Sequence, residues 1–234
     1  MLKNTVKLAV KNANEMNAFV VIPEGKGPFP AVIVFQEAFG VNAHIKDVAG
    51  RIANEGYIAI APELFHRTAP PGFESGYTDF SLVMPHFQAI NTDTLINDSR
   101  AAYDWLYAQD NVIKDKIGCI GFCLGGRASF IANSALPLAA SVSFYGGSSH
   151  TVADLAATLH GPQLFFWGGK DKHILPEHVA TVIDAVKKAE KDYINVVISY
   201  ADHAFFSDPR PSYHPDAARE AWGMTTVFLK NKLG

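Results

Sequence analysis

Short apolar runs alternate with segments of helical periodicity along almost the whole chain, and this alternation constrains the fold more than any other feature. Apolar runs that lack a period of two are typical of strands covered on both faces. The runs of this kind are Ala31–Phe35, Tyr57–Ala61, Lys116–Gly121, Leu138–Tyr145, Gln163–Trp167 and Tyr193–Ser199. The segments with helical spacing are Ile45–Ala53, Thr94–Gln109, Leu124–Ser134, Pro176–Glu190 and Asp216–Lys230.

The start of the chain has a different pattern. Two apolar-rich runs, Thr5–Val10 and Asn17–Ile22, are separated by turn-forming residues and predict an antiparallel hairpin. Further along, Pro62–Pro85 is rich in Pro, Gly and aromatic residues, and we expect it to cross the end of the sheet. The order of elements predicts an α/β fold with a mostly parallel, doubly wound sheet and helices on both faces. No repeat or linker divides the chain, so we expect one domain, 1–234.

Composition excludes several classes of protein. With 48% hydrophobic and 18% charged residues, the chain can bury a core and is not expected to be disordered. A net charge of −3 disfavours nucleic-acid binding. The first ten residues lack the apolar core of a secretory signal, and no apolar stretch reaches the roughly 20 residues that a membrane span needs. We therefore expect a cytoplasmic protein that does not associate with membranes.

The segment around Cys123 carries the clearest chemical signal. An apolar strand runs into Gly121–Gly125 (GFCLG), and a helix follows at once. The pattern G-x-C-x-G is that of a nucleophile elbow with Cys in the place usually held by Ser. Such a turn needs small residues two positions before and after the nucleophile, and it places the thiol at a helix N-terminus, which favours the thiolate. Cys119 lies inside the strand and is expected to be an ordinary core residue.

A thiol nucleophile needs a base, and the base needs an acid that orients it. Asp171 lies just beyond the run Gln163–Trp167, and His203 lies just beyond Tyr193–Ser199. The carboxyl ends of parallel strands meet at one edge of a sheet, and nucleophile, acid and base would follow in that chain order. We therefore predict a Cys123–His203–Asp171 triad.

Other candidates for these roles are weaker. Asp202 adjoins the histidine, but neighbouring side chains diverge, and His173 would reverse the expected order of acid and base. The remaining histidines lie on helices or in the Pro-rich excursion and are expected at the surface or in the core. No H-E-x-x-H or paired C-x-x-C motif occurs, and no Gly-rich phosphate loop follows a strand. No metal and no other cofactor is therefore expected.

The loop after Ala31–Phe35 is a third candidate segment. In an elbow-containing fold this loop supplies one backbone N–H of the oxyanion hole, and the residue after the nucleophile, here Leu124, supplies the other. The loop also carries Glu37, whose carboxylate would repel a developing oxyanion. Glu37 is therefore either a solvated loop residue or a partner of the thiol.

Four segments in one order resemble the dienelactone hydrolase family. They are Gln36–Asn42 (QEAFGVN), Gly121–Gly126 (GFCLGG), Gly169–Asp171 (GKD) and Asp202–Phe205 (DHAF). The likeness extends over nearly the whole chain. It implies an α/β-hydrolase fold and a carboxymethylenebutenolidase-like activity, in which a cysteine opens a small ester or lactone through an acyl-enzyme.

The resemblance also implies roles for individual residues. The implied triad consists of Cys123, His203 and Asp171. Glu37 would hold the resting thiol until substrate displaces it, after which it would take the thiol proton. Leu124 and Ala38 match the two backbone N–H donors of the oxyanion hole.

One position departs from the family pattern and leaves the substrate open. The family holds a substrate carboxylate with an arginine four residues after the catalytic histidine, where this chain has Ser207. Arg67 or Arg210 could replace that cation, and Phe39, Phe205 and Phe206 could line an apolar pocket. A general carboxylesterase acting on neutral substrates is the main alternative. A domain that only binds a ligand is disfavoured, because nucleophile, base, acid and both elbow glycines are all present.

Overall fold

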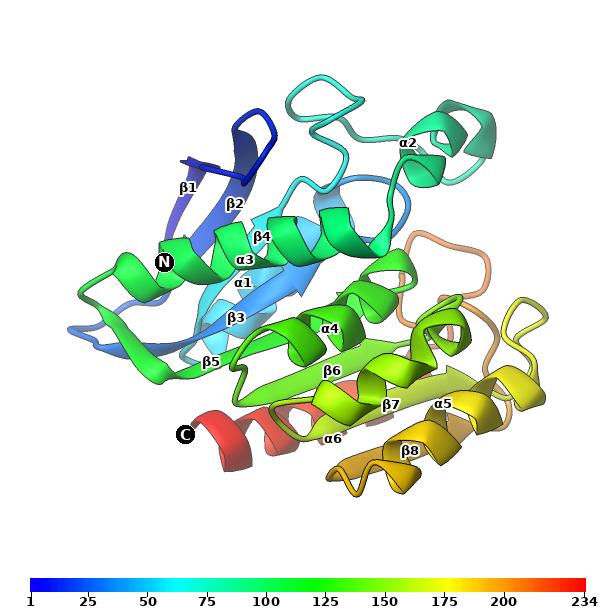
Figure 1. Cartoon of the computed structure of the whole chain (residues 1–234). Helices are drawn as coiled ribbons and strands as arrows, with labels where there is room; N and C mark the ends of the chain where they lie inside the picture. The colour runs from blue at the N-terminus through cyan, green and yellow to red at the C-terminus, as the bar shows by residue number, and fades with distance from the viewer.

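The computed structural model describes residues 1–234, which form an eight-stranded sheet with helices on both faces (Figure 1). The strands are β1 (Leu2–Leu8), β2 (Met16–Ile22), β3 (Phe29–Phe35), β4 (Ile58–Pro62), β5 (Val112–Phe122), β6 (Ala140–Phe144), β7 (Gln163–Gly168) and β8 (Tyr193–Ile198). Their order is β1-β2-β4-β3-β5-β6-β7-β8, antiparallel from β1 to β4 and parallel from there on. The predicted hairpin and the mostly parallel sheet are confirmed.

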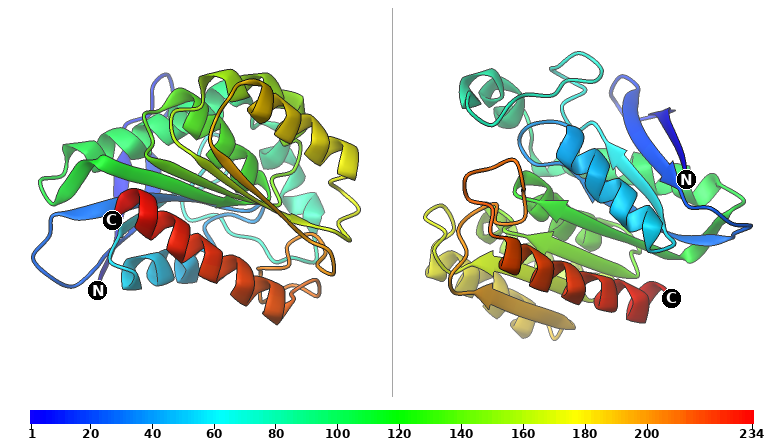
Figure 2. Two further views of the ribbon diagram at one scale, coloured as in Figure 1. Left: turned by 90° about the horizontal axis from the view of Figure 1, so that it is seen from below. Right: turned by 180° about the vertical axis from the view of Figure 1, so that it is seen from behind.

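The helices are divided between the two faces of the sheet. They are α1 (Ala43–Asn54), α2 (Met84–Gln88), α3 (Thr92–Ala108), α4 (Leu124–Ala135), α5 (Pro176–Lys188) and α6 (Pro215–Leu233), with 3-10 segments η1 (Phe80–Leu82) and η2 (Ser149–Thr158). Figure 2 shows α3, α4 and α5 on one face and α1 and α6 on the other. No helix combines the length and the apolar character that crossing a membrane requires.

The short elements η1, α2 and η2 are absent from the sequence prediction. The backbone of η2 is interrupted at Val152, where φ is −127° and ψ is 23°. An interrupted 3-10 segment does not sustain the 3.6-residue apolar repeat by which helices are detected in a sequence. The five predicted long helices are all present, with ends that differ from the prediction by a few residues.

The side chains of β3 explain why its sequence is apolar throughout. Val32 and Val34 pack into the hydrophobic cluster that includes the buried residues of α1 and α6, whereas Ile33 and Phe35 pack into the cluster that includes residues of α3 and α4. Successive side chains of a strand point to opposite faces, so a strand covered on both faces must be apolar at every position.

The carboxyl ends of the parallel strands bring distant parts of the sequence to one edge of the sheet. Glu37 follows β3, Cys123 follows β5, Tyr145 follows β6, Asp171 follows β7 and His203 follows β8. Open α/β sheets bind their ligands outside this edge.

The Pro-rich excursion packs across the same edge. Gly40 forms an isolated bridge with Glu74, and the N–H of Ser75 donates to the carbonyl of Phe39 at 3.1 Å. The excursion is thereby attached to the loop that carries Glu37.

We expect Gly125→Ala to lower the free energy of unfolding by about 3 kcal/mol, because a rigid overlap has to be relieved. A Cβ atom at Gly125 would lie 2.3 Å from the carbonyl oxygen of Phe35. Gly223→Ala in α6 is the matched control, since a Cβ there has no neighbour within 4 Å. It should raise stability by roughly 0.5–1 kcal/mol. Urea unfolding of both variants tests this, and equal stability would contradict the tight packing.

Candidate functional site

Cys123 occupies a strained turn between β5 and α4. Its φ of 55° and ψ of −111° lie outside the usual regions for a residue with a side chain, and such a conformation costs on the order of 1–3 kcal/mol. A Cβ atom at Gly121 would lie 1.9 Å from the carbonyl oxygen of Gly125, so the turn closes only with glycine at that position. The Cys123 side chain is partly exposed, whereas Cys119 is fully buried and its pKa is raised to about 12 by desolvation.

His203 is hydrogen-bonded to Asp171 and not to its neighbour Asp202. His203 Nδ1–H donates to Asp171 Oδ2 at 2.7 Å. The other oxygen of Asp171 accepts the backbone N–H groups of His173 and Ile174 at 2.7 and 3.0 Å, which fixes the orientation of the carboxylate. The Asp202 carboxylate instead accepts the backbone N–H of His203. The pairing predicted from the strand order is therefore the one that the structure contains.

The protonation of this pair follows from burial and hydrogen bonding. Burial disfavours the protonated form of His203, but hydrogen bonds with Asp171 and Cys123, and their charges, outweigh it and raise the pKa of His203 to about 10. Burial also opposes the charge on Asp171, and the bonds from His203 and two backbone N–H groups nevertheless lower its pKa. At neutral pH the imidazole therefore already carries its second proton.

Glu37 is fully buried, which excludes the interpretation of a solvated loop residue. Its Oε2 accepts a hydrogen bond from Ser207 Oγ at 3.3 Å, whereas Oε1 has no hydrogen-bond partner and lies 3.9 Å from Arg210 Nη1. Desolvation raises the pKa of Glu37, and the positive charges of His44, Arg210 and His203 only partly offset this. The Glu37 carboxylate therefore binds a proton more strongly than an exposed carboxylate does.

Arg210 reaches the site, although it lies seven positions after His203. Its guanidinium carbon is 5.6 Å from the ring centre of Phe39 and 5.8 Å from that of Tyr77. The Tyr77 hydroxyl is hydrogen-bonded to the side chain of Asn42 at 2.9 Å, so the ring is held in place. Arg210 is thus a partly exposed cation beside the buried Glu37 carboxyl group.

Arg67 does not provide a free positive charge. Its two terminal nitrogens each donate to an oxygen of the buried Asp98 carboxylate at 2.8 Å, and His66 contacts the same carboxylate. The prediction that Arg67 could hold a substrate carboxylate is corrected, because its guanidinium group is paired with Asp98 of α3.

Phe205 and Phe206 also differ from the prediction. Both are buried in the core. Phe206 stacks on Phe122 with ring centres 5.2 Å apart, and Phe205 packs against Tyr145 at 5.3 Å. The chain turns sharply just before them, at Ala204 with φ 60°, and enters the core. Phe39, by contrast, lies beside Arg210 at the site.

Ala38 and Leu124, the expected oxyanion donors, belong to one small hydrophobic cluster with residues of the excursion. Leu124 is the first residue of α4, where backbone N–H groups have no partner inside the helix. A partly exposed thiol beside an imidazolium and a helix N-terminus suits attack on a carbonyl carbon. No group of three or more His, Cys, Asp or Glu side chains is arranged to hold a metal ion.

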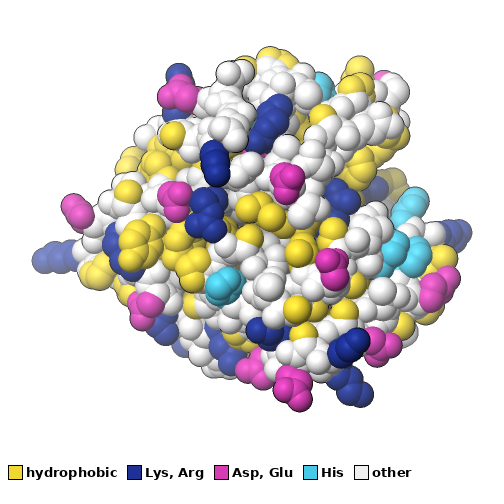
Figure 3. All heavy atoms as spheres, viewed as in Figure 1, with side chains coloured by type: hydrophobic (Ala, Val, Ile, Leu, Met, Phe, Trp, Pro, Cys, Tyr) yellow, Lys and Arg dark blue, Asp and Glu magenta, His cyan; other side chains and the backbone are white.

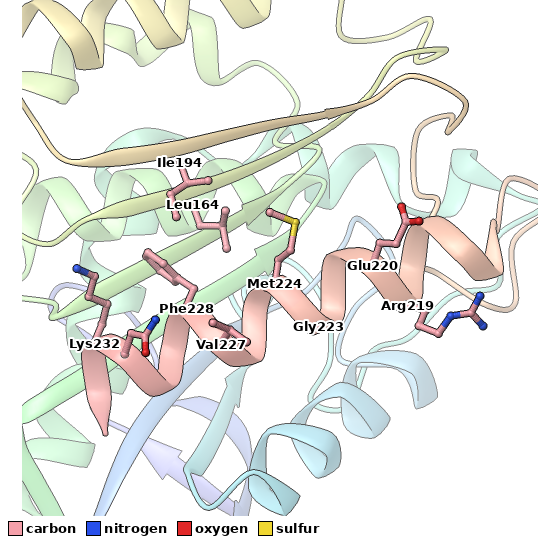
Figure 4. Close-up of a pocket in the computed structure, with 10 residues that line it drawn as sticks. Leu164, Ile194, Arg219, Glu220, Gly223, Met224, Val227, Phe228 and Lys232 are labelled. Atoms are coloured by element: carbon pink, nitrogen blue, oxygen red, sulfur yellow. The ribbon is translucent and has the colours of Figure 1, made fainter.

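The site does not coincide with the prominent hollow beside α6 (Figure 4). That hollow, of about 790 Å³, is lined by Leu164, Ile194, Met224, Val227, Phe228 and other residues of α6. None of the candidate site residues lines it. A smaller hollow of about 340 Å³ includes Asn42, His44 and Tyr77 and borders the Glu37 side of the site. On the surface, acidic and basic side chains are interspersed over the face shown in Figure 3.

Tyr145 and Tyr77 are site residues that sequence reasoning missed. Tyr145 is the last residue of the predicted run Leu138–Tyr145, so the available signal is its place at the carboxyl end of a buried strand, near which Cys123 and Glu37 also lie. Tyr77 lies in the excursion, which has no period, so only the fold reveals its contact with Arg210.

Comparisons with known proteins found relatives that match nearly the whole chain. A sequence model of the dienelactone hydrolase family matches residues 16–233. A Synechocystis protein provisionally named carboxymethylenebutenolidase is 33% identical over 240 residues, which cover 98% of this chain and 97% of the relative. A Yersinia pestis protein with the same provisional name is 36% identical over 220 residues, or 89% and 81% of the two chains.

Two solved structures are similar over almost their full length. A provisionally named dienelactone hydrolase from Klebsiella pneumoniae has a TM-score of 0.86 and 31% identity, covering 98% of this chain and 99% of that one. A dienelactone hydrolase-like promiscuous phosphotriesterase from metagenomic libraries has a TM-score of 0.84 and 27% identity, with 99% of each chain covered.

We expect Glu37→Gln to raise the free energy of unfolding at pH 7 by about 1–2 kcal/mol, the usual gain when a destabilising functional group is removed. The raised pKa means that folded Glu37 holds its proton at pH values where the unfolded chain has lost it, so Glu37 lowers stability as the pH rises above about 4.5.

Thermal unfolding at several pH values tests this expectation. The gain should vanish toward pH 4, where Glu37 is protonated in both states. The exposed Glu55→Gln is the control and should change little at any pH. A loss of stability in Glu37→Gln at pH 7 would contradict the argument.

Proposed function

Because the chain belongs to the dienelactone hydrolase family, we propose that it hydrolyses a small ester or lactone with Cys123 as the nucleophile. The observation that carries this proposal is the His203–Asp171 hydrogen bond of 2.7 Å beside a cysteine in a strained elbow. A protein that only bound a ligand would have no physical need for that combination.

In this proposal Glu37 is the base that activates the thiol. His203 has a pKa of about 10 and already carries its proton at neutral pH, so it is a poor acceptor for the proton of Cys123. Glu37 has a raised pKa and lies in the same buried cluster of charges, which suits it to take that proton. The products of the transfer are a neutral carboxyl group and a thiolate that faces the imidazolium.

The thiolate then attacks the carbonyl carbon, and a C–S bond forms as the carbonyl electrons move onto oxygen. The backbone N–H groups of Leu124 and Ala38 stabilise that oxyanion. When the oxyanion collapses, the C–O bond of the ester breaks, and the leaving oxygen takes a proton from His203. Water next gives a proton to the neutral imidazole and attacks the thioester carbon, and the C–S bond breaks to release the acid. Glu37 returns its proton to the departing thiolate, which regenerates the thiol. These residues supply nucleophile, acid and base, so the proposed reaction requires no cofactor.

Arg210 favours a substrate that carries a carboxylate near the scissile bond. It is a partly exposed cation 3.9 Å from Glu37, and a substrate carboxylate that paired with it would compete with Glu37 for the guanidinium. Substrate binding would thereby release Glu37 to take the thiol proton. Dienelactone, the reference substrate of the family, has this form.

A neutral ester is the second candidate substrate. The pairing of Arg67 with Asp98 leaves Arg210 as the cation next to Glu37, and the aromatic rings of Phe39 and Tyr77 flank it. A similar structure is that of a promiscuous phosphotriesterase, so a related scaffold accepts substrates other than lactones. A general carboxylesterase activity on neutral esters would be consistent with the aromatic rings of Phe39 and Tyr77 at the site.

Cys123→Ala should reduce the hydrolysis of dienelactone and of a neutral aryl ester by about 1,000-fold or more, because no other group can form the acyl-enzyme. Cys119→Ala is the matched control, since that thiol is buried inside β5. It should retain kcat within about two-fold. Steady-state rates with circular dichroism of each variant test this, and turnover retained in Cys123→Ala would eliminate Cys123 as the nucleophile.

Arg210→Gln should separate the two candidate substrates. If Arg210 binds a substrate carboxylate, kcat/KM for dienelactone should fall by roughly 10- to 100-fold, the range for losing a charge-assisted contact. The neutral ester should be affected far less. Arg219→Gln, which removes an exposed cation from α6, is the control. An equal loss for both substrates would argue against carboxylate recognition by Arg210.

A further inference from the structure

Tyr145 is a buried residue of the site that takes no part in the steps described above. It directly follows β6, which lies between β5 and β7 in the sheet. It is therefore placed between the strand that leads to Cys123 and the strand that leads to Asp171.

The backbone of Tyr145 is held in an uncommon conformation. Its φ is 37°, in the left-handed region that bulky residues rarely adopt. The N–H of Tyr145 donates to the carbonyl of Phe166 on β7 at 2.7 Å, and the preceding carbonyl of Phe144 accepts the N–H of Cys123 at 3.0 Å. Strain of this kind persists only where the surroundings impose it, and it is concentrated at functional sites.

The ring of Tyr145 is fixed by its neighbours and is fully buried. Its centre lies 5.1 Å from the imidazole of His203 and 5.3 Å from the ring of Phe205. The hydroxyl group consequently has one well-defined position at the inner side of the site.

Two complementary polar atoms of the site have no partner. The Tyr145 hydroxyl and Glu37 Oε1 are both buried without a hydrogen bond. Burial raises the pKa of Tyr145 well above its usual value, and the negative charges of Glu37 and Cys123 add to the effect. The hydroxyl therefore keeps its proton and remains a donor. Buried polar groups in native proteins are seldom unpaired, and those that are call for an explanation.

We propose that Tyr145 is a positioning residue that hydrogen-bonds the Glu37 carboxyl group once Ser207 and Arg210 release it. The inference rests on the proposed function, in which substrate binding frees Glu37 to take the proton of Cys123. In the substrate-free geometry Glu37 is bonded to Ser207, and Tyr145 is unused. In the released geometry Tyr145 holds the carboxyl group where it can accept the thiol proton, and no covalent bond to Tyr145 forms or breaks.

This role predicts a specific behaviour of Tyr145→Phe, which keeps the ring and removes only the hydroxyl. The variant should be at least as stable as the wild type, because an unpaired buried hydroxyl contributes no stability to the substrate-free protein. Its kcat for dienelactone should fall by roughly 10-fold or more, and KM should change little because Arg210 remains.

The decisive measurement is the ultraviolet absorbance of the Cys123 thiolate as maleate is added. Maleate is a small dicarboxylate that can pair with Arg210 and cannot be hydrolysed. In the wild type, maleate should increase the thiolate signal, and in Tyr145→Phe it should not. The Cys123→Ala variant defines the background, and Tyr57→Phe, which changes a buried tyrosine in the core beside α1, is the matched control.

The outcomes separate this inference from the proposed function. Equal thiolate signals in the wild type and in Tyr145→Phe would overturn the role of Tyr145 and leave the Glu37 mechanism in place. No signal in either protein, with Cys123-dependent hydrolysis intact, would overturn the release of Glu37 and the role of Tyr145 together. A marked loss of stability in Tyr145→Phe would also count against it, since a structural hydroxyl would then explain the residue.

Discussion

The close approach of Gly125 to the end of β3 is the contact on which the site depends. The Cα of Gly125 packs so tightly against the carbonyl groups of Phe35 and Gln36 that a Cβ atom would overlap both. This contact presses the elbow directly against the loop that carries Glu37 and Ala38. Backbone packing therefore brings together the Cys123 thiol, the buried carboxyl group and the backbone of Leu124 and Ala38, and this arrangement does not depend on flexible side chains.

The same packing creates the electrostatic conditions of the site. Because the loop is sealed by the excursion and by the core beneath it, Glu37 is cut off from water and its pKa rises. His203 is also buried, though less completely, and its hydrogen bond to Asp171 reverses the effect and keeps the imidazole protonated. Burial thus raises the proton affinity of the Glu37 carboxylate, and the hydrogen bond to Asp171 keeps the imidazole of the substrate-free site protonated. Burying these two titratable groups lowers the stability of the site, and the rigid sheet holds them in place.

The elements that sequence reasoning identified are those set by local pattern and strand order. The hairpin, the parallel strands, the elbow and the pairing of His203 with Asp171 follow from apolar runs and from the rule that carboxyl ends share an edge. Other contacts depend on packing between segments that have no common period. The pairing of Arg67 with Asp98 joins the excursion to α3, and the turn at Ala204 sends Phe205 into the core. No local pattern of charge or hydrophobicity encodes either arrangement.

The position of Arg210 shows how the fold can bring a cation to a site whose motif position lacks one. The N–H of Arg210 donates to the carbonyl of Ser207 at 3.0 Å, so the chain between them forms a tight turn and doubles back. The turn brings the guanidinium to within 3.9 Å of the carboxyl group with which Ser207 is hydrogen-bonded. The serine and the arginine thus act on the same group from positions three residues apart. A missing cation at one motif position is therefore weak evidence against charge recognition, because a single turn of the backbone can restore it.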